Sequence, residues 1–443
     1  MGTGRFDEAA DVLAERLGYD RSARTFSTAP EEATKGNTDA YILLAALLDD
    51  EMRATSEAEA VLDRLVQVNA DDARAWLAMR GWHAQRGDMA AAAADVRKAI
   101  EVAPDDLEAL LAEFELKLDQ RAFADAEAAA TKAAELYPSE ERVVRAEAML
   151  ALRQGDREQA IRLLESGLER MPGQIALLLM LADTQLQVGD VDSTERTVAQ
   201  LTSLAGGSNP AVGLLRARVN MAQQKWLEAQ QLLEEVRPQA NPASDTVRQI
   251  DLYLGQCYEK LGQFDRQLEA NQRVLSDDPN SVAARVGAAA ALAASGRKEQ
   301  ALGEYEVIFN AMAAEDVSAF PQLWNPLLQL RIDRQLAKPA DERAWTDVDS
   351  LVDLLGASPR INDAQIAILR ADVMVRKDQA SEAIALLREA LSKDPASQPL
   401  LGALITLVLR FEGPTAAQEI VDAAPAEARQ NATLMTLELS LIH

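Results

Sequence analysis

Apolar residues recur at helical spacing along most of the chain, in paired segments separated by short turns. Residues 73–104 show the pattern well: Trp76 and Trp82 lie on the apolar face of a first helix. Gly87 follows where the helix should end, because glycine readily adopts the left-handed conformation of a C-cap. A second helix then runs to Pro104, which cannot continue it. Each such unit is therefore predicted to be a helix–turn–helix.

Two sets of residues mark the ends of helices with a period of 34. The first set consists of prolines that follow helical segments, namely Pro104, Pro138 and Pro172. The second set marks the turns inside the units, at Gly87, Arg121, Gly155 and Gly189. A helix pair cannot bury its apolar face alone, so repeated pairs must stack on their neighbours. The sequence predicts an all-α solenoid.

The period and the residues at key positions resemble the tetratricopeptide repeat family. In the unit "DLYLGQCYEKLGQFD", Leu254, Gly255, Tyr258 and Gly262 match the first helix and the turn of that family. Small residues stand where the two helices of a unit should touch, at Ala92, Ala99, Ala126, Ala133, Ala160, Ala383 and Ala390. The resemblance implies a right-handed superhelical solenoid of helix–turn–helix repeats.

Some positions depart from the family pattern. The first-helix glycine is replaced by Arg80, Phe114 and Ala148 in other units. The small position of the second helix is Gln267 in the unit that holds Tyr258. Such variation is ordinary within the family, but it weakens the transfer of any particular partner.

The pattern divides the chain into five segments. They are a half repeat with a second helix only (1–18), a loop or linker (19–37), a repeat array (38–313), an irregular helical pair with longer loops (314–362), and further repeats with a terminal helix (363–443). Both end helices lack a partner in the sequence. Two interpretations stay open: the array is part of a longer protein, or the end helices are covered by self-association.

Composition supports the all-α prediction and narrows the partners. Hydrophobic residues make up 48% of the 443 residues, but aromatic residues only 4%, and Ala, Leu, Glu and Arg favour helices. The richness in Ala and Arg suggests a bacterial protein. The net charge of −26 repels nucleic acids and anionic lipids. No apolar run is long enough to span a membrane and no signal peptide begins the sequence, so a soluble protein of the cytoplasm or periplasm is expected.

Residues for catalysis or metal binding are scarce. Cys257 is the only cysteine, which excludes an intrachain disulfide and a cysteine-based zinc site. We interpret Cys257 and His83 as packing residues, and His443 lies at the end of the chain. No phosphate-binding glycine loop is present. We expect no enzyme activity, no cofactor and no metal.

The resemblance implies that first helices line a concave groove, which takes extended peptides or helices from partner proteins. The groove positions would be Leu77, Leu111, Arg145, Leu179, Leu252 and Ile368. The Lys/Asn clamp of a subclass that binds acidic C-termini is absent. Our candidate partner-binding residues are Arg142, Arg145, Arg153, Met149, Leu179 and Gln256.

The three arginines could bind a partner carboxylate. The alternative is that they pair with Glu115, Asp119 or Glu147 of the chain itself. The functional hypothesis is a non-catalytic protein–protein interaction scaffold. Its rivals are the recognition array of a larger enzyme, such as a glycosyltransferase, and a self-assembling structural segment.

Overall fold

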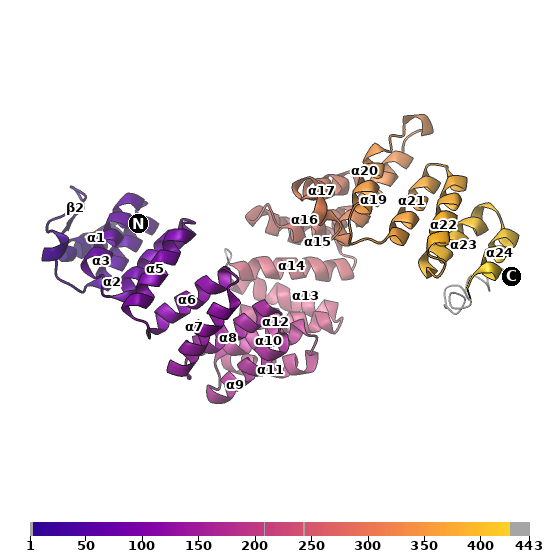
Figure 1. Ribbon diagram of the computed structural model, residues 1–443. Helices are drawn as coiled ribbons and strands as arrows, with labels where there is room; N and C mark the ends of the chain where they lie inside the picture. The colour runs from indigo at the N-terminus through magenta and orange to yellow at the C-terminus, as the bar shows by residue number, and fades with distance from the viewer. Residues whose placement is uncertain (1–2, 208, 242–243, 426–443) are drawn as a thin grey trace. The chain divides into compact units, whose positions relative to one another are not determined.

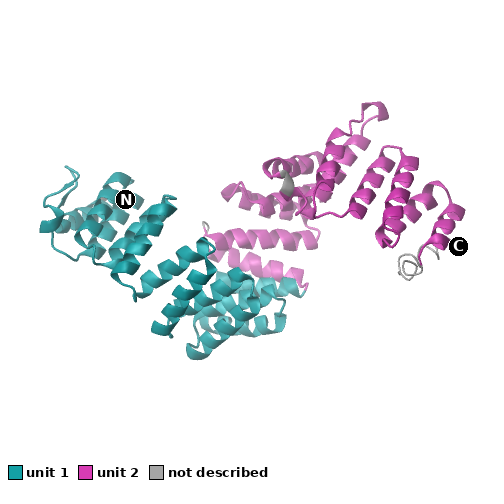
Figure 2. Ribbon diagram, viewed as in Figure 1, with its two compact units in different colours: residues 1–223 teal, residues 224–443 magenta. Residues whose placement is uncertain are grey.

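The computed structural model describes residues 3–207, 209–241 and 244–425. The chain divides into two compact units, residues 1–223 and 224–443 (Figure 2). Both consist almost wholly of short helices that follow one another in antiparallel pairs (Figure 1). The predicted all-α repeat fold is confirmed. None of the described helices combines the length and the apolarity that crossing a bilayer requires.

Unit 1 contains these elements: α1 Thr3–Leu17, β1 Tyr19–Asp20, β2 Thr25–Phe26, the 3-10 turn η1 Pro30–Glu32, α2 Thr38–Ala46, the π-helical turn η2 Leu47–Glu51, α3 Thr55–Val68, α4 Ala73–Gln85, α5 Met89–Val102, α6 Leu107–Asp119, α7 Phe123–Leu136, α8 Glu141–Gln154, α9 Arg157–Arg170, α10 Ile175–Gln187, α11 Val191–Ala205 and α12 Pro210–Ala222. The first helices α4, α6, α8 and α10 each contact the next first helix, and each also packs on its own second helix. The first helices of neighbouring repeats therefore form one layer.

The turns inside the repeats share one backbone conformation. Gly87, Gly155 and Gly189 have φ angles of 76°, 87° and 80°, and Arg121 has 56° at the equivalent position. This left-handed conformation is easy for glycine and strained for arginine. An aspartate follows each of the three glycines and caps the next helix, as Asp88 does by accepting from Ala91 N at 2.9 Å. The 34-residue period in the sequence is therefore a period of turns.

Residues 19–37, for which the sequence predicts a loop or linker, contain a short antiparallel pair that packs on the helices. Tyr19 of β1 lies opposite Phe26 of β2. Arg64 of α3 is only 6% exposed; it donates to the carbonyl oxygen of Thr28 at 2.7 Å and lies 5.1 Å from the centre of the Phe26 ring. A buried guanidinium needs such partners, because its charge has lost contact with water. Arg64 thus anchors this segment to α3.

Unit 2 contains these elements: α13 Trp226–Val236, the 3-10 turn η3 Arg237–Gln239, α14 Asp245–Lys260, α15 Phe264–Asp277, α16 Val282–Ala294, α17 Lys298–Ala311, α18 Ala314–Val317, α19 Pro321–Leu336, the 3-10 turn η4 Ala340–Glu342, α20 Thr346–Gly356, α21 Asp363–Arg376, α22 Ala380–Lys393, α23 Gln398–Phe411 and α24 Pro414–Ala423. Residues 314–362, predicted to be an irregular pair, hold the short α18, the proline-containing α19, η4 and α20. The predicted terminal helix at residues 431–443 lies outside the described residues.

The apolar core is divided into successive clusters along each unit. In unit 1 a typical cluster joins three consecutive helices, such as α8, α9 and α10 through Val144, Leu164 and Leu177. In unit 2 one larger cluster extends from Leu268 in α15 to Val373 in α21, across the irregular pair. The repeats of unit 1 are therefore held by local contacts, and the middle of unit 2 by one continuous core.

Candidate functional site

A groove in unit 1 is formed by three successive first helices, α4, α6 and α8. Its volume is about 270 Å³, and it is lined by Leu77, Arg80, Glu108, Leu111, Ala112, Phe114, Glu115, Arg142, Arg145, Ala146 and Met149. The three helices present equivalent positions to the groove because they belong to repeats of equal length. Leu77, Leu111 and Arg145 are such a set, each 34 residues from the next.

The groove combines apolar and charged surface. Leu77, Leu111 and Met149 are half-buried, so each keeps part of its apolar surface exposed to the groove. Phe114, at a position where the family prefers glycine, is 2% exposed and belongs to the core beneath. A groove with exposed apolar surface can take the apolar face of a partner peptide or helix.

Ion pairs between neighbouring repeats line this groove. Arg80 lies 2.7 Å from Glu115, and Arg142 lies 2.7 Å from Glu108 on the preceding first helix. Arg142 also contacts Glu140 at 2.9 Å. These hydrogen bonds with Glu140 and Glu108 raise the pKa of Arg142 above its ordinary value. Carboxylates of the chain therefore hold Arg142 in place. They are not those of Glu115, Asp119 or Glu147, the partners considered from the sequence.

Arg145 is held less tightly than Arg142. Its shortest distance to a carboxylate is 3.8 Å, to Glu141 one turn earlier, and 43% of its side chain is exposed. Exposed ion pairs of this geometry contribute about 0–1 kcal/mol, so little free energy opposes exchanging Glu141 for another carboxylate. Arg145 is the cation of this groove that can most readily accept a new partner.

The other three predicted residues do not line this groove. Arg153 is exposed near the end of α8, and Leu179 of α10 packs partly buried against the cluster that contains Leu178 and Val198. Gln256 is exposed on α14, which belongs to unit 2. The structure therefore brings together Arg142, Arg145 and Met149 of the six predicted residues.

Sequence reasoning missed the ion pairs Arg80–Glu115 and Glu108–Arg142, although a signal for them exists. Arg80 and Glu115 are 35 residues apart, and Glu108 and Arg142 are 34 apart. Opposite charges separated by one repeat length fall next to each other on adjacent first helices. The same spacing recurs at three other ion pairs, Asp39–Arg74, Asp183–Arg218 and Lys298–Asp333.

The side chains with possible catalytic chemistry serve packing and pairing. His83 Nδ1 lies 2.7 Å from the carboxylate of Asp95, which is 7% exposed, and burial raises the pKa of Asp95 despite the nearby histidine. Cys257 is fully buried, and burial raises its pKa to about 12. Its thiol is therefore protonated at neutral pH and a poor nucleophile. Within the described ranges, no group of three or more His, Cys, Asp or Glu residues is arranged to hold a metal ion.

Comparison with known proteins points to a repeat family. The family model described as tetratricopeptide repeat matches residues 151–219 and 374–437. No curated protein matches the sequence. Similar solved structures include a tetratricopeptide repeat protein of Parabacteroides merdae, with 14% identity over 68% of this chain and 98% of that chain and a TM-score of 0.35.

Two further similar structures come from different organisms. PilF of Pseudomonas aeruginosa shows 16% identity over 56% of this chain and 95% of that chain, with a TM-score of 0.35. Human IFIT1, solved as a dimer with m7Gppp-AAAA, shows 14% identity over 95% of this chain and 94% of that chain, with a TM-score of 0.41.

Proposed function

The chain is a tetratricopeptide repeat protein, and we propose that it is a non-catalytic scaffold that binds peptides or helices of partner proteins in the groove between α4, α6 and α8. The observation that carries this proposal is the combination of half-buried Leu77, Leu111 and Met149 with the loosely paired Arg145. Repeat arrays of this kind typically serve protein–protein interaction.

The partner segment has a definite chemistry in this proposal. Apolar side chains of the partner cover Leu77, Leu111 and Met149, and an acidic side chain replaces Glu141 as the partner of Arg145. A new carboxylate on a guanidinium gains a charge-assisted hydrogen bond. Arg142 stays with Glu108 and Glu140 and forms the fixed edge of the site.

Two properties of the chain favour proteins over other partners. The net charge of −26 disfavours long phosphate backbones, whose binding depends on many cationic contacts. Cys257, the only thiol of the chain, is buried and therefore not accessible as a nucleophile. Both arguments favour a binding function.

A displayed library of random peptides, selected on the full chain, tests the proposal. We expect enriched peptides that place an acidic residue next to apolar residues. The variant Arg145→Glu should weaken their binding at least about tenfold, since it replaces attraction by repulsion. Arg153→Glu is the matched control, because it adds the same charge on α8 away from the groove.

The alternatives from the sequence give different outcomes. If no peptide is enriched and the chain sediments as an oligomer that depends on concentration, self-assembly replaces the scaffold. If peptides bind equally well to the groove variant and to the control, the groove is the wrong site. A recognition array of a larger enzyme would use the same groove chemistry, and its peptides would match a substrate of that enzyme.

A further inference from the structure

A second cavity, in unit 2, lies where η3, the start of α14 and the end of α15 meet. Its volume is about 350 Å³, and it is lined by Arg237, Pro238, Ala240, Val247, Arg273, Ser276 and Asp277. The cavity is separate in the sequence from the groove of unit 1, and the inference drawn from it does not depend on the proposed function.

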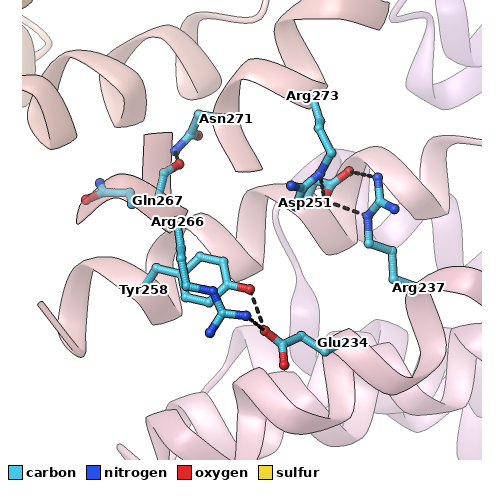
Figure 3. Close-up of polar contacts among 8 residues, drawn as sticks. All are labelled: Glu234, Arg237, Asp251, Tyr258, Arg266, Gln267, Asn271 and Arg273. Carbon is cyan, nitrogen blue, oxygen red and sulfur yellow. Dashed lines mark hydrogen bonds and ion pairs between the residues drawn. The ribbon is translucent and has the colours of Figure 1, made fainter. Parts of the chain in front are cut away.

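The two arginines of this cavity are anchored by one buried carboxylate. Asp251 of α14 is 2% exposed. Arg237 donates from Nε to Oδ1 at 2.8 Å and from Nη2 to Oδ2 at 2.9 Å, so this pair is bidentate. Arg273 donates to Oδ1 from Nε at 2.9 Å and from Nη2 at 2.7 Å (Figure 3). Asp251 does not line the cavity, whereas both arginines do.

The buried carboxylate of Asp251 needs only one arginine to balance its charge, but two are bonded to it. A single bidentate guanidinium already neutralises a buried carboxylate and satisfies both of its oxygens. The second guanidinium gives the three groups a net charge of about +1, in a chain whose overall charge is −26. Both arginines remain partly exposed, at 34% and 39% of their side chains. Asp277 lines the same cavity and partly offsets this charge, since it acts on Arg237 through space without a hydrogen bond among the described residues. Asp251 alone therefore does not account for the second arginine.

Hydrogen-bond donors remain on both arginines. A guanidinium carries five N–H groups, and the bonds to Asp251 use one on Nε and one on Nη2 of each arginine. Among the described residues, neither Nη1 group takes part in a hydrogen bond. Because the carboxylate holds each guanidinium plane in place, little side-chain freedom is lost when these donors bind a ligand.

We propose that Arg237 and Arg273 form a binding site for a small oxyanion, that is, the phosphate or carboxylate group of a small molecule. Phosphate and carboxylate both match the planar array of donors on a guanidinium. One negatively charged residue, Asp277, is exposed and lines the same cavity. Its charge weakens the binding of an anion and favours ligands that bring a hydroxyl or ammonium group to that side.

Equilibrium dialysis of the full chain tests the site, with inorganic phosphate in one arm and succinate in the other. Chloride keeps the ionic strength constant, so that nonspecific screening does not change. We expect saturable binding of one anion per chain. Arg273→Gln should weaken it about tenfold, the loss of one charge-assisted contact, while Arg237 keeps Asp251 paired. Asp277→Asn should strengthen it about threefold, because a like charge is removed.

Arg266→Gln is the matched control, since Arg266 lies on the same helix but binds Glu234 at 2.5 Å and does not line the cavity (Figure 3). Saturation in the phosphate arm alone assigns a phosphate ligand, and saturation in the succinate arm alone assigns a carboxylate. The inference is overturned if neither anion saturates the wild-type chain, or if Asp277→Asn leaves the affinity unchanged. Helical circular dichroism of each variant shows whether it is folded.

Discussion

Asn271 of α15 occupies the space that a side chain on Gly287 of α16 would need. A Cβ atom added to Gly287 would lie 2.6 Å from Asn271 Oδ1. On the other side, a Cβ atom on Gly255 of α14 would lie 2.8 Å from Asn271 Nδ2. Asn271 is 3% exposed, and its Nδ2 donates to the carbonyl oxygen of Gln267 at 2.8 Å (Figure 3). Two glycines on flanking helices thus make room for one buried amide.

This packing predicts a strong coupling between Gly287 and Asn271. We expect Gly287→Ala to destabilise α14–α16 by about 1–3 kcal/mol, because the added methyl group overpacks a filled site. In the double variant Gly287→Ala, Asn271→Ala the methyl group has room, so the cost should be smaller than the sum of the two single changes. Hydrogen exchange of α14–α16 measures the effect.

Gly303→Ala is the control for the helix propensity of alanine. Gly303 is an exposed glycine inside α17 with no atom near its added Cβ, so the change should stabilise by about 0.5–1 kcal/mol. Equal effects of Gly287→Ala and Gly303→Ala would show that Asn271 does not fill the site.

The turn between α6 and α7 predicts a stabilising substitution. Arg121 has a φ of 56° where the equivalent Gly155 has 87°. Arg121→Gly should stabilise the repeat by about 0.5–1 kcal/mol, because glycine adopts this conformation without strain. Gly155→Arg should destabilise its repeat, because it places an arginine in the left-handed conformation. Urea unfolding midpoints of the two variants test this, and a loss of stability in Arg121→Gly would mean that the arginine side chain contributes more than its backbone costs.

The anchoring of residues 19–37 should depend on Arg64. Arg64→Met keeps the apolar stem but loses the hydrogen bond to Thr28. We expect amide exchange within this segment to become at least about tenfold faster, since a charge-assisted bond contributes about 1.5–3 kcal/mol. Lys98→Met, an exposed position 34 residues later, should leave the exchange unchanged. Identical exchange in both variants would assign the anchoring to the aromatic contacts alone.

Cys257 should be unreactive in the folded protein. Burial raises its pKa to about 12, so at pH 8 the thiol is neutral and hidden from a thiol reagent. As it is the only cysteine, the whole signal reports this site. The reagent should react with one thiol per chain after unfolding in guanidinium and with almost none before. Rapid reaction of the native chain would contradict the burial.

The same burial fixes the sign of a pH effect. Above about pH 8.5 the thiol of the unfolded chain loses its proton, whereas in the folded chain it keeps the proton up to about pH 12. The folded state then binds more protons, so stability falls as pH rises. Cys257→Ala should reduce this fall between about pH 8.5 and 9, where the tyrosines of the unfolded chain, with an ordinary pKa of about 10, are still mostly protonated. If stability falls equally steeply with pH in the variant and in the wild type, groups other than Cys257 cause the fall.

The sequence predicts the repeats well because their turns have strict backbone requirements. Gly87, Gly155 and Gly189 lie at the same φ, and the period they define is that of the helix pairs. Gln267 shows the limit of this reasoning. It departs from the small residue of the family, yet it is 1% exposed and donates to the carbonyl oxygen of Gly287 at 3.1 Å. Its amide nitrogen is satisfied by a backbone carbonyl of the next repeat, which no pattern within one repeat reveals.

The candidate groove could be predicted only in part. Arg142, Arg145 and Met149 were among the six predicted partner-binding residues, and they line one groove, which Arg153 of the same helix does not. The opposing Glu108 comes from the preceding repeat, and it becomes visible only when charges one repeat apart are compared. Arg64 and the paired segment at residues 19–37 interrupt the period and leave no repeating pattern to read.

The division of the core into local clusters has a mechanical consequence. When the ends of unit 1 are pulled apart, each cluster of three consecutive helices resists only until its own contacts break. Unit 1 should therefore lengthen in small steps, each releasing roughly 110 Å of chain for a 34-residue repeat. The continuous cluster from α15 to α21 joins many helices, so that part of unit 2 should yield in one larger event. Under tension we therefore expect unit 1 to extend gradually and the middle of unit 2 to resist until it unfolds as a whole.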